Sequence, residues 1–200
     1  MERLTISELM GSPDRLQAFS EALRQGAVAA LPTDTLYGFA ADGNSEAGVA
    51  KVYRLKGREE NKPLILFLDH QERLGELGIT PCHEIAHLLR LHWPGALTGI
   101  FSLAGKPLVA FPHPTLGIRV PAHPDLLRLI GSCPNVLLTT SANRSGQEPL
   151  QDPDAIEAEF RTELDFLLDG GVLRPSEPST VISCDRWPPR VFRQGKVRIA

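Results

Sequence analysis

The sequence predicts an α/β fold, with a twisted, open sheet of mixed parallel and antiparallel strands and flanking helices. Apolar residues at helical spacing alternate along the chain with short apolar runs of strand length, which is typical of this class. The gaps around Lys106 and after Val181 have hairpin length, so some neighbouring strands should be antiparallel. Because 17 glycines and 17 prolines are spread without a low-complexity linker, we expect residues 1–200 to form a single domain.

Each expected element follows from the local pattern of apolar residues and from the capping, glycine and proline residues that bound it. Ser12 and Pro13 are typical of a helix start, and Gly26 ends that helix. Asn44 or Ser45 caps the second helix, and Asp152 caps the last. We expect helices at 13–25, 46–55, 82–92, 126–130 and 153–160. Short apolar runs predict strands at 27–31, 38–41, 64–68, 98–103, 108–111, 117–120 and 136–140.

Composition excludes several classes of protein. The 21 basic and 24 acidic residues give a net charge of -3, which argues against a general polyanion-binding surface. No apolar run reaches the roughly 20 residues of a membrane helix, and the N-terminus lacks a signal peptide's apolar stretch, so we expect a cytoplasmic protein without a membrane partner. The three cysteines lack CxxC spacing and are expected to be buried thiols.

Two segments near the N-terminus have ligand-binding character. Residues 33–35, Thr-Asp-Thr, follow a buried strand, at the place where open α/β sheets hold ligands, although such residues also cap turns without any function. Five cations lie between Lys51 and Lys62, next to a buried strand. A solvated helix end is the usual reason for such a run. No Walker A or GxGxxG fingerprint is present, so bound phosphates would need side chains.

Hydroxyl groups and one arginine at strand ends indicate a pocket for a small polar ligand. Thr115, Arg119, Thr139 and Ser141 all stand at such positions, and Arg119 suits a carboxylate.

Residues 83–87 read His-Glu-Ile-Ala-His, which matches the zincin motif HExxH on an expected helix. No third ligand has supporting context, so we interpret this segment as the polar face of an amphipathic helix and expect no zinc.

Six segments together carry a family resemblance. They are PTDTLYG at 32–38, YRLKGREENKPL at 53–64, HWPGALT at 92–98, GIRVPAHP at 117–124, TTSANRSG at 139–146 and STV at 179–181. In this order they resemble the YrdC-like family of threonylcarbamoyl-AMP synthases. The resemblance implies a concave, positively charged cleft. It also implies synthesis of threonylcarbamoyl-AMP from L-threonine, bicarbonate and ATP for tRNA threonylcarbamoyladenosine modification.

The same resemblance implies a role for individual residues. Threonine contacts fall on Thr35, Arg119 and Thr139. ATP contacts fall on Arg58, Lys62, Thr115, Ser141, Asn143 and Arg193. We assign catalysis, as charge neutralisation around the phosphates, to Lys56 and Arg58. Mg²⁺ is expected to arrive with ATP, with Asp34 as a candidate partner, and no resident metal is expected.

Departures from the family and competing interpretations remain open at this point. Phe67 stands where some members have a histidine, and Pro149 where some have a serine. One alternative is an RNA-binding module, but the basic loop lacks interleaved aromatic residues. Another is a carbamoyl-transfer domain of the hydrogenase-maturation kind. We also expect transient contact with tRNA or with the machinery that transfers the threonylcarbamoyl group.

Overall fold

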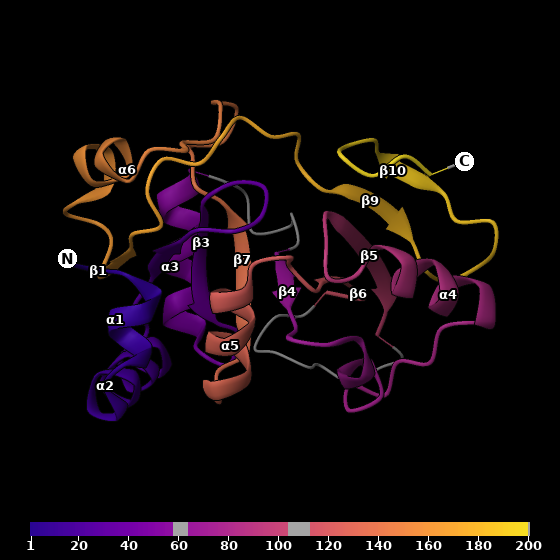
Figure 1. The fold of residues 1–200 in the computed structure, drawn as a ribbon, viewed down its shortest axis with the longest axis horizontal. Coiled ribbons are helices and arrows are strands. Elements are labelled where there is room, and N and C mark those ends of the chain that lie inside the picture. The colour runs from indigo at the N-terminus through magenta and orange to yellow at the C-terminus, as the bar shows by residue number, and fades with distance from the viewer. Residues whose placement is uncertain (58–63, 104–112, 200) are drawn as a thin grey trace.

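The computed structural model describes residues 1–57, 64–103 and 113–199. Its strands form one sheet in the order β1-β8-β2-β3-β7-β4-β6-β5-β9-β10 (Figure 1). The strands are β1 (Glu2–Leu4), β2 (Ala29–Leu31), β3 (Gly38–Asp42), β4 (Ile65–Phe67), β5 (Leu97–Ser102), β6 (Thr115–Arg119), β7 (Leu137–Ser141), β8 (Phe166–Leu168), β9 (Thr180–Ser183) and β10 (Val191–Arg193). The helices are α1 (Ile6–Met10), α2 (Pro13–Arg24), α3 (Glu46–Lys56), η1 (Gln71–Leu74), α4 (His83–His92), α5 (Pro124–Ser132) and α6 (Pro153–Phe160).

Strand pairing confirms the mixed sheet that the sequence predicts. β5 pairs antiparallel with β6, and β9 with β10, whereas β4 runs parallel to β6 and β5 parallel to β9. The expected strand at 108–111 lies outside the described residues. The helix expected at 126–130 begins earlier, at Pro124, because the ring nitrogen Nδ1 of His123 accepts a hydrogen bond from the Leu126 amide.

The edge of the sheet near the N-terminus was not predicted. β1 and β8 are each three residues long and pair in parallel, and β8 also pairs with β2. Strands this short show no measurable alternation of apolar and polar residues. α1 begins with a capping box between Thr5 and Glu8, directly after β1.

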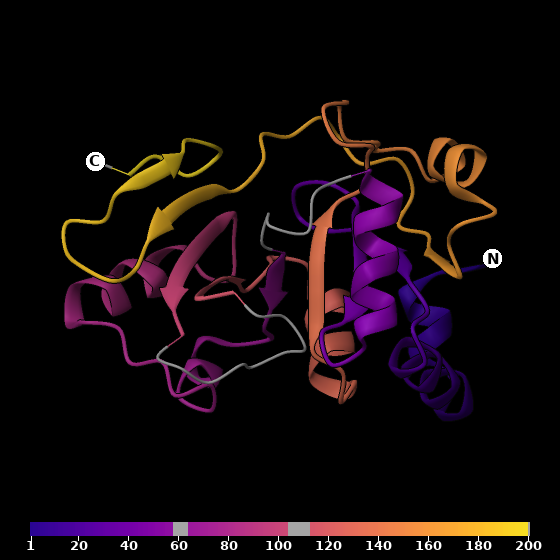
Figure 2. The same cartoon turned by 180° about the vertical axis from the view of Figure 1, so that it is seen from behind.

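Helices cover both faces of the sheet, as alternate residues of β3 show. Ala40 packs in a cluster with residues of α1, α2 and α5, whereas Phe39 and Ala41 pack in a second cluster with residues of α3, α4 and α6. Figure 1 shows α1, α2 and α5 in front of the sheet, and Figure 2 shows α3 on the opposite side. No helix in the described ranges is long and apolar enough to cross a membrane.

The cysteine expectation is confirmed at two positions and wrong at one. Cys133 and Cys184 are buried, but Cys82 is exposed because it occupies the N-cap position of α4, outside the packed face of that helix.

Candidate functional site

A cavity of about 470 Å³ lies on the sheet between β7 and β10. Its floor consists of alternate residues of neighbouring strands, among them Ile65, Gly117 and Thr139, which therefore face the same side of the sheet. Phe67 on this floor also packs in the cluster with α2 and α5, so the cavity continues the face that those helices cover. The lining residues are Thr33, Thr35, Leu36, Tyr37, Gly38, Leu64, Ile65, Phe67, Thr98, Ile100, Gly117, Arg119, Thr139, Thr140, Ser141, Glu148, Pro149, Gln151, Ser176, Pro178, Ser179, Val181 and Arg193.

One row of residues crosses the floor from strand to strand and includes two arginines. Arg119 on β6 is followed by Thr98 on β5, because Ile118 is opposite Gly99 in this antiparallel pair. Thr98 pairs with Val181 on β9, and Val181 with Arg193 on β10. Three strand spacings separate the two arginines, so their Cα atoms lie about 14 Å apart. We call these four residues the cross-strand row.

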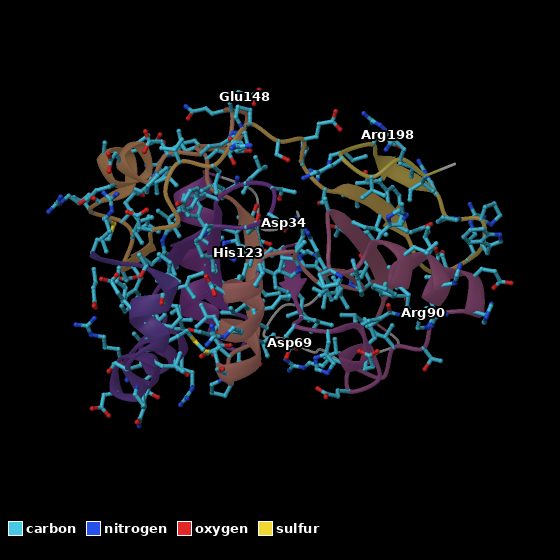
Figure 3. All side chains as sticks on the ribbon, viewed as in Figure 1. Asp34, Asp69, Arg90, His123, Glu148 and Arg198 are labelled. Atoms are coloured by element: carbon cyan, nitrogen blue, oxygen red, sulfur yellow. The ribbon has the colours of Figure 1, made fainter. Side chains whose placement is uncertain are left out.

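Arg119 is a buried cation held on several sides. Its Nη2 donates to Asp34 Oδ1 at 2.6 Å, its Nη1 to Thr35 Oγ1 at 3.0 Å and its Nε to the Gly95 carbonyl at 2.9 Å. Burial lowers the pKa of Arg119, and the Asp34 carboxylate opposes that shift. Because Asp34 is not among the described residues that line the cavity, it supports the guanidinium from behind; Figure 3 shows Asp34 near the middle of the molecule.

The loop between β2 and β3 brings Thr35 to this arginine. Thr33 Oγ1 accepts from the amides of Thr35 and Leu36, both at 3.1 Å, which closes a tight turn. Two residues later the Tyr37 hydroxyl donates to the Gly171 carbonyl and accepts from the Gly170 amide, each at 2.8 Å. Burial raises the pKa of Tyr37 to about 12. The loop is therefore fixed on both sides of Thr35.

A second polar cluster lies at the end of β7. Lys56, the last residue of α3, is 3% exposed, and its Nζ donates to the Ser141 carbonyl at 2.7 Å and to Asn143 Oδ1 at 2.6 Å. Ser141 Oγ donates to the same Asn143 oxygen at 2.6 Å. Arg144 Nη1 bonds the Leu55 carbonyl at 2.7 Å, which ties this loop to the end of α3. Among the residues of this cluster, Ser141 is the one that the structure places in the lining of the cavity.

Arg193 closes the other end of the cavity. Its Nε and Nη2 both donate to the Ser179 carbonyl, at 3.1 and 2.9 Å, and Nη2 also approaches Ser179 Oγ at 3.2 Å. Burial and the positive charge of Arg119 both lower the pKa of Arg193. Glu148, at the upper edge of the molecule in Figure 3, adds one negative charge to the lining, so the positive charge of the cleft stays a prediction.

The structure brings five of the predicted site residues into one cavity. These are Thr35, Arg119, Thr139, Ser141 and Arg193. Lys56 and Asn143 lie behind Ser141, and Asp34, the candidate Mg²⁺ partner, lies behind Arg119. Thr115 is on the same face of β6 as Arg119 but is not among the described lining residues. Arg58 and Lys62 lie outside the described residues, and the roles of all these residues toward substrates stay predictions.

Sequence reasoning did not assign a role to several lining residues. Thr98 and Ser179 each stand within a family segment, HWPGALT and STV, yet neither looked different from an ordinary strand-end hydroxyl. Gly117 adds no side chain to the floor of the cavity. A Cβ at this position would lie 3.3 Å from Ile100 Cδ1 and 3.4 Å from Ile65 Cγ1, so there is little room for one. Only the strand register shows that these residues face one space.

The HExxH segment lies elsewhere. On α4, His83, Glu84 and His87 are exposed, whereas Ile85 and Leu89 are buried against the sheet. The described residues include no group of three or more histidine, cysteine, aspartate or glutamate side chains placed to hold a metal ion. The positions of the two histidines fit the polar face of an amphipathic helix.

Known relatives share this fold. Residues 21–195 match the Sua5/YciO/YrdC family, described as "Telomere recombination". The chain is 31% identical over 175 residues to threonylcarbamoyl-AMP synthase of Pyrococcus abyssi, covering 86% of this chain and 52% of that protein. It is 32% identical over 169 residues to the Halorhodospira halophila synthase, covering 82% and 88%. The P. abyssi Sua5 structure complexed with L-threonine superposes with a TM-score of 0.81 at 29% identity, covering 92% of this chain and 55% of that one.

The lengths of the relatives differ. This chain spans about half of the P. abyssi and Bacillus subtilis synthases, 52% and 56%. The family match itself covers most of the present sequence, and the mixed sheet agrees with the structures of the relatives. The chain therefore belongs to the Sua5/YciO/YrdC family.

Proposed function

We propose that this chain is a nucleotidyltransferase that makes threonylcarbamoyl-AMP and pyrophosphate from L-threonine, bicarbonate and ATP. One observation carries the proposal: a single cavity holds a buried, hydroxyl-bonded arginine on β6 and a second arginine, beside Ser179, on β10. Such an arrangement suits two anionic substrates that must meet. Relatives named threonylcarbamoyl-AMP synthase, and a Sua5 structure with L-threonine, favour this proposal over an RNA-binding module or a carbamoyl-transfer domain.

The part of the cavity around Arg119 suits the amino acid. Arg119 keeps one hydrogen on each of Nη1 and Nη2 that has no partner in the described part of the chain, and these two hydrogens can take a carboxylate. Thr35, on Nη1, and Thr139, on the floor, flank that position with hydroxyls. Phe67 lies with its ring centroid 6.0 Å from the guanidinium and gives the pocket an apolar wall.

We assign the nucleotide to further polar residues of the lining. Ser141 lines the cavity at the end of β7, where Lys56 and Asn143 hold it in place, and Arg193 lines it at β10. ATP would enter as its Mg²⁺ complex, so the metal belongs to the substrate. Arg58 and Lys62, as the resemblance implies, would add cations around the phosphates. The protein would then act mainly by positioning the reactants and neutralising charge.

The proposed reaction joins L-threonine, bicarbonate and ATP in two steps. The threonine ammonium and bicarbonate give the carbamate with release of one water and one proton. A carbamate oxygen then attacks the α-phosphorus of ATP, the bond from that phosphorus to the oxygen bridging to the β-phosphate breaks, and pyrophosphate leaves. The mixed anhydride is an activated acyl group, so the consuming reaction is acyl transfer, here to tRNA.

The decisive experiment measures pyrophosphate release with each substrate omitted in turn. We expect release only when ATP, L-threonine and bicarbonate are all present with Mg²⁺. ATP turnover that is independent of threonine would rule out the proposed function.

A further inference from the structure

The chain between β8 and β9 forms part of the wall of the cavity. β8 is second and β9 ninth in the order of the strands, so residues 169–179 cross most of the sheet, and they do so without forming a helix or a strand. Figure 1 shows this segment passing along the upper side of the molecule. It contributes Ser176, Pro178 and Ser179 to the lining of the cavity. We call residues 169–179 the strap.

The side chain of Tyr37 holds the first part of the strap. This tyrosine is fully buried, and its hydroxyl accepts from the Gly170 amide and donates to the Gly171 carbonyl, each at 2.8 Å. A Cβ at Gly170 would lie 2.8 Å from Cβ and Cγ of Pro32, so the strap packs directly on the loop that carries Thr35. The hydroxyl therefore spends its only hydrogen on the strap.

The last part of the strap is held by the arginine that we assign to the nucleotide. Arg193 donates from Nε and Nη2 to the Ser179 carbonyl. Pro175 and Pro178 lie between the two attachments, and each proline ring fixes one backbone angle, so this part of the strap has little slack. A displacement of the strap at Tyr37 would therefore reach the carbonyl that orients Arg193.

The loop that carries Thr35 has supports besides this contact. Thr33 Oγ1 accepts from the amides of Thr35 and Leu36, and Thr35 Oγ1 accepts from Arg119. A phenylalanine at position 37 would leave all of these bonds in place. Although Tyr37 is two residues from Thr35 in the sequence, its hydroxyl serves the strap. We therefore expect loss of the hydroxyl to act on the nucleotide and to spare threonine.

We infer that Tyr37 is a positioning residue for the nucleotide: its hydroxyl holds the strap, and through the strap Ser179 and Arg193, in the arrangement that ATP requires. This inference rests on the proposed function. The hydroxyl has no hydrogen left for a substrate, so Tyr37 acts through the strap and is not a catalytic residue. Burial raises the pKa of Tyr37 to about 12, so the hydroxyl remains a donor at neutral pH.

Steady-state kinetics of Tyr37→Phe test the inference. This change removes the hydroxyl and keeps the ring. We expect the KM for ATP to rise about tenfold and kcat to fall about tenfold, because a displaced strap misplaces the nucleotide against the carbamate. The KM for threonine should change less than about threefold. Ser20→Ala is the control, because Ser20 is a buried hydroxyl on α2 that bonds Asn135 Oδ1 at 2.7 Å and is not among the described lining residues. It should lower Tm and leave every KM unchanged.

Gly171 tests the same attachment from the side of the strap. Its φ is +71°, and among the described residues no atom lies within 4 Å of a Cβ built there, so Gly171→Ala strains the backbone without a clash. Gly78, in the turn after η1, has a φ of +68° and equally open surroundings. Both alanine variants should lower Tm similarly, but only Gly171→Ala should repeat the kinetic pattern of Tyr37→Phe. If Tyr37→Phe does not fold, Gly171→Ala decides.

Hydrogen exchange follows the strap without any reaction. The Gly170 amide is bonded to Tyr37, and the Leu173 amide donates to the Gln151 carbonyl at 2.9 Å. Tyr37→Phe should speed exchange about tenfold at both amides, because the strap opens more often once its first attachment is lost. Exchange at the Thr35 amide, which is bonded within its own loop, should stay at the wild-type rate.

The outcomes separate this inference from the proposed function. Wild-type KM and kcat for ATP in both strap variants, or a threonine KM that rises as much as the ATP KM, overturns the inference and leaves the proposed function standing. If the wild type releases no pyrophosphate, the proposed function fails, and calorimetric binding of ATP replaces the kinetics. An equal Kd for ATP in the wild type and Tyr37→Phe, or no binding to the wild type, then overturns the inference as well.

Discussion

Breaking the buried ion pair between Asp34 and Arg119 should destabilise the fold strongly. The two side chains are 11% and 5% exposed, and their closest nitrogen and oxygen atoms are 2.6 Å apart. At an effective dielectric constant of about 20, unit charges about 4 Å apart attract by about 4 kcal/mol. Removing one partner of such a pair typically costs about 3–5 kcal/mol, because the other charge stays buried without compensation. We expect Asp34→Ala to lower the free energy of unfolding by that amount.

A double-mutant cycle isolates the pair. Arg119→Met leaves Asp34 without its cation, whereas Asp34→Ala combined with Arg119→Met leaves neither charge. The double variant should therefore be more stable than the sum of the single changes predicts, by about 2–4 kcal/mol. Urea denaturation of the four proteins at pH 7 measures this coupling. Additive effects would refute the conclusion that Asp34 holds Arg119 by charge. Both proteins that lack Arg119 should also bind L-threonine more weakly than the wild type does.

Three further predictions concern the rest of the site. Arg58→Ala should lower kcat/KM about 100-fold while Tm barely moves, and unchanged turnover in steady-state pyrophosphate release would remove Arg58 from the nucleotide site. Lys56→Met should remove the charge-assisted hydrogen bonds from Lys56 Nζ to Ser141 and Asn143, so we expect Tm to fall and the KM for ATP to rise at least tenfold, and a normal KM would argue that Ser141 needs no support. Above pH 10 the unfolded state should release the Tyr37 proton before the folded state does, because the folded pKa is raised to about 12. The contribution of about 2–3 kcal/mol that is present below pH 10 should therefore decline as the pH rises through 12, and Tyr37→Phe should flatten that decline in unfolding experiments.

The sequence alone determined the local elements and the segments that carry the chemistry. Ser12 and Asp152 each cap the helix predicted after them, since a hydroxyl or carboxylate before a proline satisfies free amides whatever the tertiary structure. The family segments contain Thr35, Arg119, Thr139 and Ser141, and the resemblance also implied Arg193; these five residues share one cavity. The caps depend on short-range pattern, and the first four site residues lie in contiguous motifs.

Only the tertiary structure decided how those segments face one another. β1 and β8 are stabilised by pairing across more than 160 residues of sequence, so nothing local predicts them. The cross-strand row depends on the register of four strands, where a shift of one residue would turn Thr98 to the opposite face. Asp34 became the support of Arg119 because the loop before β3 crosses to β6. Such contacts arise from long-range packing, and a single sequence carries no direct signal of them.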